Sequence, residues 1–392
     1  MVQSVVVIGG NDAIMLGVIR AVGSCGYKVI VIHLCALTGK GATQLDYYCR
    51  YVSSFHCIEK GSRKALIDLL LTIGKEESLK PVIITLDDYA SSVVDNNLRL
   101  LEISFLVQHI RHEEGAIVAL MNKHVQKELA KSAGFNVVPG WPIYCVGGRY
   151  VIPENIQYPC FVKGLTSYDS NKKNQRKCSD AEELAAHLEK CANESDAPLY
   201  AESFIEMDKE MGVLGTCKDG VGEASVLAEL LVMGRGFSQG VSMFGKVSPI
   251  DRSSDLAEKV RRLLKNTGYT GIFNLDIVES KGQLYFVEMN FRYAAYGYAV
   301  FSAGYNVLRE FINILTQCDD PSRATWNQSF YFNNKIGCYG VADRAISIKE
   351  YFGFKRKADY SLVDFNSDPK PYFVFLLRCI ALFIRSRVRR TK

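Results

Sequence analysis

The sequence predicts an α/β protein with a small doubly wound unit at the N-terminus and a longer α+β region after it. Over residues 1–114, strand-like apolar runs alternate with segments of helical apolar spacing. From about 115 to 315 extended apolar runs dominate, and the last two form a hairpin. The 392 residues, 48% apolar and 23% charged, suffice for two or three compact units and exclude extensive disorder.

The N-terminal unit is predicted from the alternation of strands and helices along the chain. Strands are expected over 4–10, 27–34 and 80–88, and helices over 11–26 and 62–77. The first strand ends in Gly-Gly-Asn-Asp, which lacks the Gly-x-Gly-x-x-Gly spacing of a dinucleotide loop, so a tight turn is favoured there. The third ends in Asp87 and Asp88, for which helix capping is a simpler account than ligand binding.

The following region mixes helices with longer strands. Helices are expected over 113–135, 180–194, 256–268 and 300–315, and strands over 158–164, 198–205, 211–217 and 224–233. Residues 271–292 read as two strands joined by a Lys-Gly turn. Residues 316–392 form a C-terminal extension that ends in an apolar and basic tail, 371–392.

The hairpin carries the strongest chemical signal. Glu288 and Asn290 are two residues apart on a strand and therefore share a face, and the short turn can place Asp276 opposite them. Three oxygen ligands on one sheet face suit Mg²⁺, whose octahedron phosphate oxygens and waters complete. Arg292 continues the same face, where a guanidinium can hold a phosphate. A metal site is favoured over a plain solvated strand face.

Lysines at two strand or helix ends add a second signal. Lys163 ends the buried-type run YPCFVKG, so its amine either meets a counter-charge such as a triphosphate or extends to solvent. Lys123 opens a helix after Asn122. Glu202 lies in AESFIEMDKE, a segment whose backbone could read an adenine edge while a carboxylate holds ribose hydroxyls. None of these is specific alone.

In this order and spacing, the residues resemble the ATP-grasp superfamily. The resemblance covers about 115–315, with a small lobe at about 130–200, after a preceding domain over 1–114. It implies a Rossmann-like pre-ATP-grasp domain followed by a two-lobed ATP-grasp module that clamps ATP. The segment EMNFRYAAYGYAVFSAGYN (288–306) looks most like the D-aspartate ligase-like group of carboxylate–amine ligases.

The resemblance implies a role for each matched residue. Lys163 and Arg292 would be catalytic, Arg292 by stabilising the transferred phosphoryl group or the acyl phosphate. The implied ATP-binding residues are Lys123, Lys163, Glu202, Ile205 and Glu210, the last at the ribose. The implied ligands of Mg²⁺ (or Mn²⁺) are Asp276, Glu288 and Asn290.

The activity implied is an ADP-forming ligation of a carboxylate to an amine through an acyl phosphate. An amino acid ligase for cell-envelope or surface-glycan precursors fits the subgroup. A degenerate ATP-binding protein with a regulatory role and a carboxylase or carbamoyl-phosphate type of enzyme stay open. Two departures from the family bear on this: residues 165–177, which should cover the phosphates, contain no glycine, and Asp276 replaces the commoner Glu.

The cysteine pattern and the net charge limit which cell compartment and which partners the sequence suggests. The 12 cysteines include no Cys-x-x-Cys pair, which fits free thiols in a reducing cytoplasm. The net charge is +5, and residues 378–392 hold six basic side chains and no acid, which leaves the rest at −1. A nucleic-acid surface on the body is therefore not indicated. Residues 371–392 fit either an interfacial helix at the inner face of a membrane or a core-packed helix. The sequence leaves open whether the protein forms a homodimer.

Overall fold

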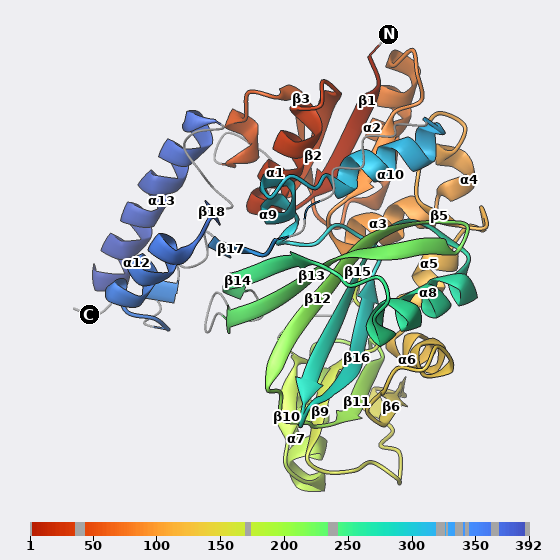
Figure 1. Ribbon diagram of the computed structural model, residues 1–392. Helices are drawn as coiled ribbons and strands as arrows, with labels where there is room; N and C mark the ends of the chain where they lie inside the picture. The colour runs from red at the N-terminus through yellow and green to blue at the C-terminus, as the bar shows by residue number, and fades with distance from the viewer. Residues whose placement is uncertain are drawn as a thin grey trace.

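The structure is a computed structural model that describes residues 2–35, 44–168, 174–233, 242–318, 326, 328–333, 340–341, 345–361 and 368–388. Figure 1 shows three tiers: an N-terminal sheet at the top, a long and mostly antiparallel sheet across the middle and a small sheet at the bottom.

The N-terminal sheet is parallel, in the order β3-β2-β1-β4. Its strands are β1 (Ser4–Gly9), β2 (Lys28–Cys35), β3 (Val52–Glu59) and β4 (Val82–Thr85). Its helices are α1 (Asp12–Gly23), the 3₁₀ helix η2 (Asp46–Tyr48), α2 (Arg63–Glu76), α3 (Asp88–Asp95) and α4 (Leu98–Leu101). The predicted doubly wound unit is confirmed. The edge strand β3 was not predicted, because its residues are mostly half-buried and include Ser53, Ser54 and His56.

The small sheet is antiparallel, in the order β10-β9-β11-β6. Its strands are β6 (Gly140–Ile143), β9 (Cys160–Gly164), β10 (Arg176–Cys178) and β11 (Leu199–Ser203). A separate pair, β7 (Cys145–Val146) and β8 (Arg149–Tyr150), lies beside α7 (Ala181–Ala192). Leu184 and Leu188 of α7 pack with Val162 and Ala201 in one apolar cluster, which holds the helix on the sheet.

The long sheet has the order β16-β15-β12-β13-β14-β17-β18, with β5 paired to β15. Its strands are β5 (His109–Ile110), β12 (Lys209–Lys218), β13 (Val221–Met233), β14 (Ser242–Pro249), β15 (Tyr269–Ser280), β16 (Gln283–Asn290), β17 (Phe330–Asn333) and β18 (Tyr360–Ser361). Helix α8 (Asp255–Thr267) packs on β13, and α6 (Lys123–Ser132) packs on β16. The remaining helices are α5 (Ala116–Leu120), α9 (Gly297–Ser302), α10 (Val307–Thr316), α12 (Ile348–Lys357) and α13 (Pro369–Val388).

Two expected helices are each divided in the structure. Residues 113–135 contain α5 and α6, because the Asn122 side chain accepts from the backbone of His124 and caps a new helix. Residues 300–315 contain the end of α9 and most of α10, because Asn306 caps α10. In both cases the apolar spacing by itself predicts one continuous helix, and a polar capping residue divides it into two.

One apolar cluster joins the N-terminal sheet to the long sheet. Residues of α1, α9 and α10, such as Leu16, Val300 and Phe311, are buried together with Leu214 of β12. The two units therefore share a core, which fixes the end of β4 against the region that follows β16. Among the described residues, no helix has the length and apolar character needed to cross a membrane.

Candidate functional site

The hairpin β15–β16 brings the predicted metal-binding residues together. Asp276 and Glu288 are direct partners in the antiparallel register, because a bulge at Val287 shifts the pairing by one residue after Ile277–Phe286. The turn between the strands uses Lys281 (φ 50°) and Gly282 (φ 74°), a left-handed pair that matches a tight hairpin turn. Asn290 lies two residues beyond Glu288 and pairs with Asn274.

Asp276 accepts hydrogen bonds from two amides. Asn274 Nδ2 donates to one carboxylate oxygen at 2.8 Å, and Asn290 Nδ2 donates to the other at 3.0 Å. Tyr296 supports Asn274 by donating from its hydroxyl to Oδ1 at 2.6 Å. Burial and the neighbouring Glu288 carboxylate raise the pKa of Asp276 to about 7. Two carboxylates held this close favour a positive charge between them.

Glu288 and Arg292 complete the face. Lys123 Nζ lies 3.4 Å from Glu288. Burial opposes ionisation of Glu288, but the charges of Lys123, Lys163 and Arg292 outweigh it and lower its pKa to about 2. Arg292 donates to Asn290 Oδ1 at 3.2 Å and to Asp88 at 2.9 Å. Burial disfavours the charge on Arg292, yet Asp88 and Asp276 raise the pKa of the guanidinium, which therefore stays charged.

Glu202 is held between two lysines. Lys163 Nζ donates to Oε1 at 2.7 Å, and Lys127 Nζ donates to Oε2 at 2.6 Å. Burial would raise the pKa of Glu202, but the two ammonium groups lower it. Burial lowers the pKa of Lys127 against the attraction of Glu202. The cluster is nearly enclosed, so each charge depends on its partners for solvation.

Helix α6 sets the position of two of these lysines. Lys123 and Lys127 are four residues apart and therefore lie on one face. Lys123 also donates to Ser167 Oγ at 3.1 Å. Gln126 fastens the helix to β16, because its amide donates to the Met289 carbonyl and accepts from the Met289 N–H, at 2.9 and 2.8 Å. The lysines and the acids are thus fixed to one frame.

Of the other two implied nucleotide-binding residues, Glu210 lies on β12 and Ile205 lies between β11 and β12. Glu210 pairs with Val278 while Gly212 pairs with Asp276, so Glu210 and Asp276 share a face of the long sheet. Burial raises the pKa of Glu210. Ile205 is half-buried in the extended segment after β11. The middle of the glycine-free loop, residues 169–173, lies outside the described residues.

Two residues of this cluster were missed by sequence reasoning. Lys127 carries a usable signal, since it repeats Lys123 at helical spacing, but its partner Glu202 is distant in sequence. Asp87 caps α3 by accepting from the Ala90 N–H at 2.8 Å, as predicted. Asp88, for which capping was also favoured, instead forms the ion pair with Arg292.

The residues around Asp276 form a candidate site for a divalent cation. No group of three or more His, Cys, Asp or Glu side chains suited to a metal is found in the part of the chain that the structure describes. Here two carboxylates, Asp276 and Glu288, face each other, and Asn290 lies beside them with its amide nitrogen on Asp276 and its amide oxygen on Arg292. Burial and the Glu288 carboxylate raise the pKa of Asp276, and a cation bound between the two acids would relieve their repulsion. Hard oxygen donors with few protein carboxylates fit Mg²⁺.

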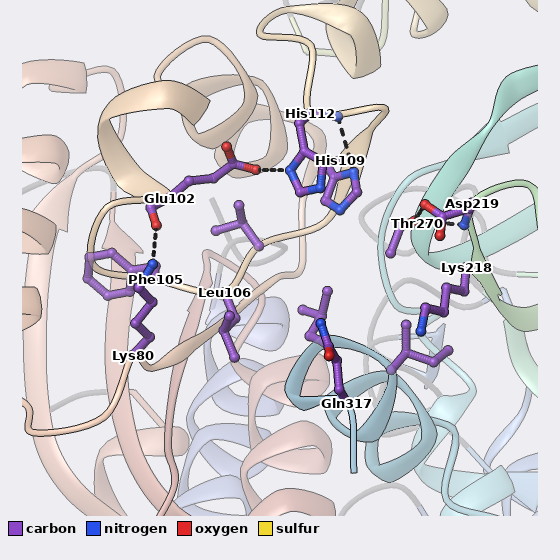
Figure 2. Close-up of a pocket in the computed structure, with 13 residues that line it drawn as sticks. Lys80, Glu102, Phe105, Leu106, His109, His112, Lys218, Asp219, Thr270 and Gln317 are labelled. Carbon is purple, nitrogen blue, oxygen red and sulfur yellow. Dashed lines mark hydrogen bonds and ion pairs between the residues drawn. The ribbon is translucent and has the colours of Figure 1, made fainter. Parts of the chain in front are cut away.

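A cavity of about 410 Å³ lies apart from this cluster, between the N-terminal unit and the ends of β12 and α10 (Figure 2). Its described lining includes none of the predicted site residues. The rings of His109 and His112 stack at one end, with centroids 3.6 Å apart, and His112 Nδ1 lies 2.5 Å from Glu102. Lys218 and Gln317 extend into it from the opposite side.

Comparison with known proteins bears on the fold. No protein-family model matches the sequence, and no curated protein matches it. Solved structures do match. N5-carboxyaminoimidazole synthetase from Staphylococcus aureus has a TM-score of 0.62 at 19% identity, over 89% of this chain and 86% of that chain. L-amino acid ligase from Bacillus licheniformis has a TM-score of 0.62 at 14% identity, over 84% and 79%.

A third similar structure is the biotin carboxylase domain of 2-oxoglutarate carboxylase from Hydrogenobacter thermophilus, solved with MgADP, ADP and bicarbonate. Its TM-score is 0.64 at 20% identity, over 84% of this chain and 74% of that chain. The predicted fold is confirmed: the chain has a Rossmann-like N-terminal unit followed by an ATP-grasp fold.

Proposed function

We propose that the protein is an ATP- and Mg²⁺-dependent ligase that joins a carboxylate to an amine and forms ADP. One observation carries the proposal. Asp276, Glu288 and Asn290 lie on one sheet face, and Arg292 contacts Asn290 just after β16. Lys123 pairs with Glu288 and lies on the same helix as Lys127, which belongs to the enclosed group of Lys127, Lys163 and Glu202. Clustered cations beside paired acids are what a metal-bound polyphosphate requires. The similar structures, one solved with MgADP, support this.

The reaction proposed has two steps. A carboxylate oxygen of the substrate attacks the γ-phosphorus of ATP, which forms an acyl phosphate and releases ADP. The amine nitrogen then attacks the acyl carbon, phosphate leaves, and the nitrogen loses a proton. This reaction needs no covalent nucleophile from the protein, so the contribution of the chain is orientation and charge stabilisation.

The proposed roles follow the contacts. Lys163 is nearly buried with Glu202 as its partner, and a phosphate oxygen would satisfy the same ammonium. Arg292, held by Asp88, is oriented toward Asn290 and would stabilise charge on the phosphoryl group. Asp276, Glu288 and Asn290 would hold Mg²⁺, which supplies charge neutralisation at the phosphates when bound.

The implied nucleotide contacts remain part of the proposal. Lys123 would contact phosphate or adenine, Glu202 and the backbone near Ile205 would contact adenine, and Glu210 would contact the ribose. For the substrates, we propose an amino acid as one component and a cell-envelope or surface-glycan precursor as the acceptor. The resemblance of residues 288–306 to D-aspartate ligase-like proteins supports this choice.

Amine carboxylation is the second candidate, with bicarbonate as the acid. It is favoured by the likeness to the carboxylase domain that was solved with bicarbonate. The two candidates share the first step and differ in the acid. Bicarbonate dependence of ADP release therefore separates them.

The test is ADP release from Mg-ATP by the purified protein, with D- and L-amino acids or bicarbonate as the acid and peptide-type amines as acceptors. Release should require both an acid and an amine. Lys163→Ala and Glu288→Ala should abolish it. Glu279→Gln is the matched control, because Glu279 pairs with the exposed Lys209 on the same sheet. ATP-dependent turnover that survives in both site variants would refute the assignment.

A further inference from the structure

The C-terminal helix α13 exposes a row of large apolar side chains. Phe373, Leu377, Ile380 and Ile384 are 54%, 67%, 57% and 55% exposed. Their spacing of four, three and four residues places them on one face of the helix. Leu376, at 37%, lies at the edge of this apolar row. Exposed apolar side chains gathered on one face mark an interaction surface, whereas scattered ones do not.

The opposite face of α13 is fixed to the protein. Phe375 is 5% exposed and belongs to the apolar cluster that joins the N-terminal sheet to the long sheet. Just before the helix, the Asp368 carbonyl accepts from Arg20 at 3.1 Å, and its carboxylate accepts from the Arg50 N–H at 2.9 Å. The helix is therefore anchored along one side, and the apolar row faces away from that anchor. Figure 1 shows α13 along the outer edge of the molecule.

Charge distinguishes this end of the chain from the rest. Residues 369–392 contain seven Lys or Arg residues and no Asp or Glu. The first 377 residues together carry a net charge of −1. The positive charge thus lies on the same helix as the apolar row and directly after it. A second copy of the chain would bring like charges together, whereas an anionic surface would neutralise them.

We propose that α13 binds the surface of a membrane that contains anionic lipids. The row of Phe373, Leu377, Ile380 and Ile384 would enter the boundary between headgroups and acyl chains, and the basic residues would contact the lipid phosphates. The helix lies in the plane of the interface, because its other face is packed on the protein. This surface is independent of the proposed ligase site.

The test is co-sedimentation of the full chain with vesicles of phosphatidylcholine containing 30% phosphatidylglycerol, compared with phosphatidylcholine alone. At about 0.1 M salt, binding to the anionic vesicles should be at least tenfold tighter, and about 0.5 M salt should weaken it because counter-ions screen the attraction. Leu377→Glu with Ile380→Glu should reduce binding at least tenfold. The double variant Arg389→Gln/Arg390→Gln should bind the anionic vesicles more weakly, and its binding to vesicles of phosphatidylcholine should be unchanged.

Val221→Glu is the matched control, because Val221 is an 80% exposed apolar residue at the start of β13. It should bind vesicles as the wild type does. Thermal unfolding of every variant checks that folding is intact, which exposed substitutions should preserve. Equal binding by the Leu377→Glu/Ile380→Glu variant overturns the proposal. The proposal is also overturned if the wild type does not bind vesicles and instead forms a dimer, measured by sedimentation velocity, that the Leu377→Glu/Ile380→Glu variant converts to a monomer.

Discussion

Replacement of Glu202 by Gln is the sharpest test of how the site is held together. The carboxylate accepts from Lys127 at 2.6 Å and from Lys163 at 2.7 Å, and the two lysine side chains are only 3% and 7% exposed. Gln keeps the shape but removes the charge and turns an amide N–H₂ toward one lysine. Loss of one partner from a buried ion pair costs about 3–5 kcal/mol. We expect the free energy of unfolding to fall by about that amount.

The assay is urea unfolding followed by fluorescence and circular dichroism, with midpoints and slopes compared. Glu279→Gln is the control, because Glu279 pairs with the exposed Lys209 at 3.2 Å, and such pairs contribute about 0–1 kcal/mol. An equal loss of stability in the two variants would refute the reasoning.

The pH dependence of the Glu202 effect has a defined sign. The lysines hold the pKa of Glu202 below its ordinary value of 4.5. For an acid with a lowered pKa, the stabilisation is present above the ordinary value and is lost as the pH falls through the folded one. The difference between wild type and Glu202→Gln should therefore be constant at neutral pH and shrink below about pH 4.5. A difference that grows in acid would contradict the ion-pair account.

Three further predictions concern the frame around the site. Burial raises the pKa of Asp95 from 3.8 to about 6. The contribution of Asp95 to the free energy of unfolding should therefore fall by about 2–3 kcal/mol as the pH rises from about 4 to 6. Asp95→Asn should remove this pH dependence in urea unfolding. A Cβ at Gly212 would lie 2.6 Å from the Tyr296 hydroxyl, which supports Asn274, so Gly212→Ala should cost about 1–3 kcal/mol in urea unfolding and lower ADP release. Asn122→Ala should cost about 1 kcal/mol by urea midpoint, because it removes the cap of α6. An unchanged slope, unchanged turnover or an unchanged midpoint would contradict the respective argument.

Much of the site was within reach of the sequence because strand geometry is local. Residues two apart on a strand share a face, so the sequence placed Glu288 and Asn290 side by side. Their meeting with Asp276 also needs a bulge at Val287, because the two-residue turn alone would pair Asp276 with Val287. Helix ends were predicted less well. Apolar spacing continued through Asn122 and Asn306, and the caps became visible only with the backbone in place.

The sequence by itself determined the alternation of strands and helices, the acids of the hairpin and the separation of a basic, apolar C-terminus from a near-neutral body, because each depends on residues close together in the chain. Only the tertiary structure decided which distant charges meet. Lys127 meets Glu202 across 75 residues, and Arg292 meets Asp88 across 204. Such pairs form where packing of α6 on β16, and of the N-terminal unit on the long sheet, excludes water, and no local pattern specifies that packing.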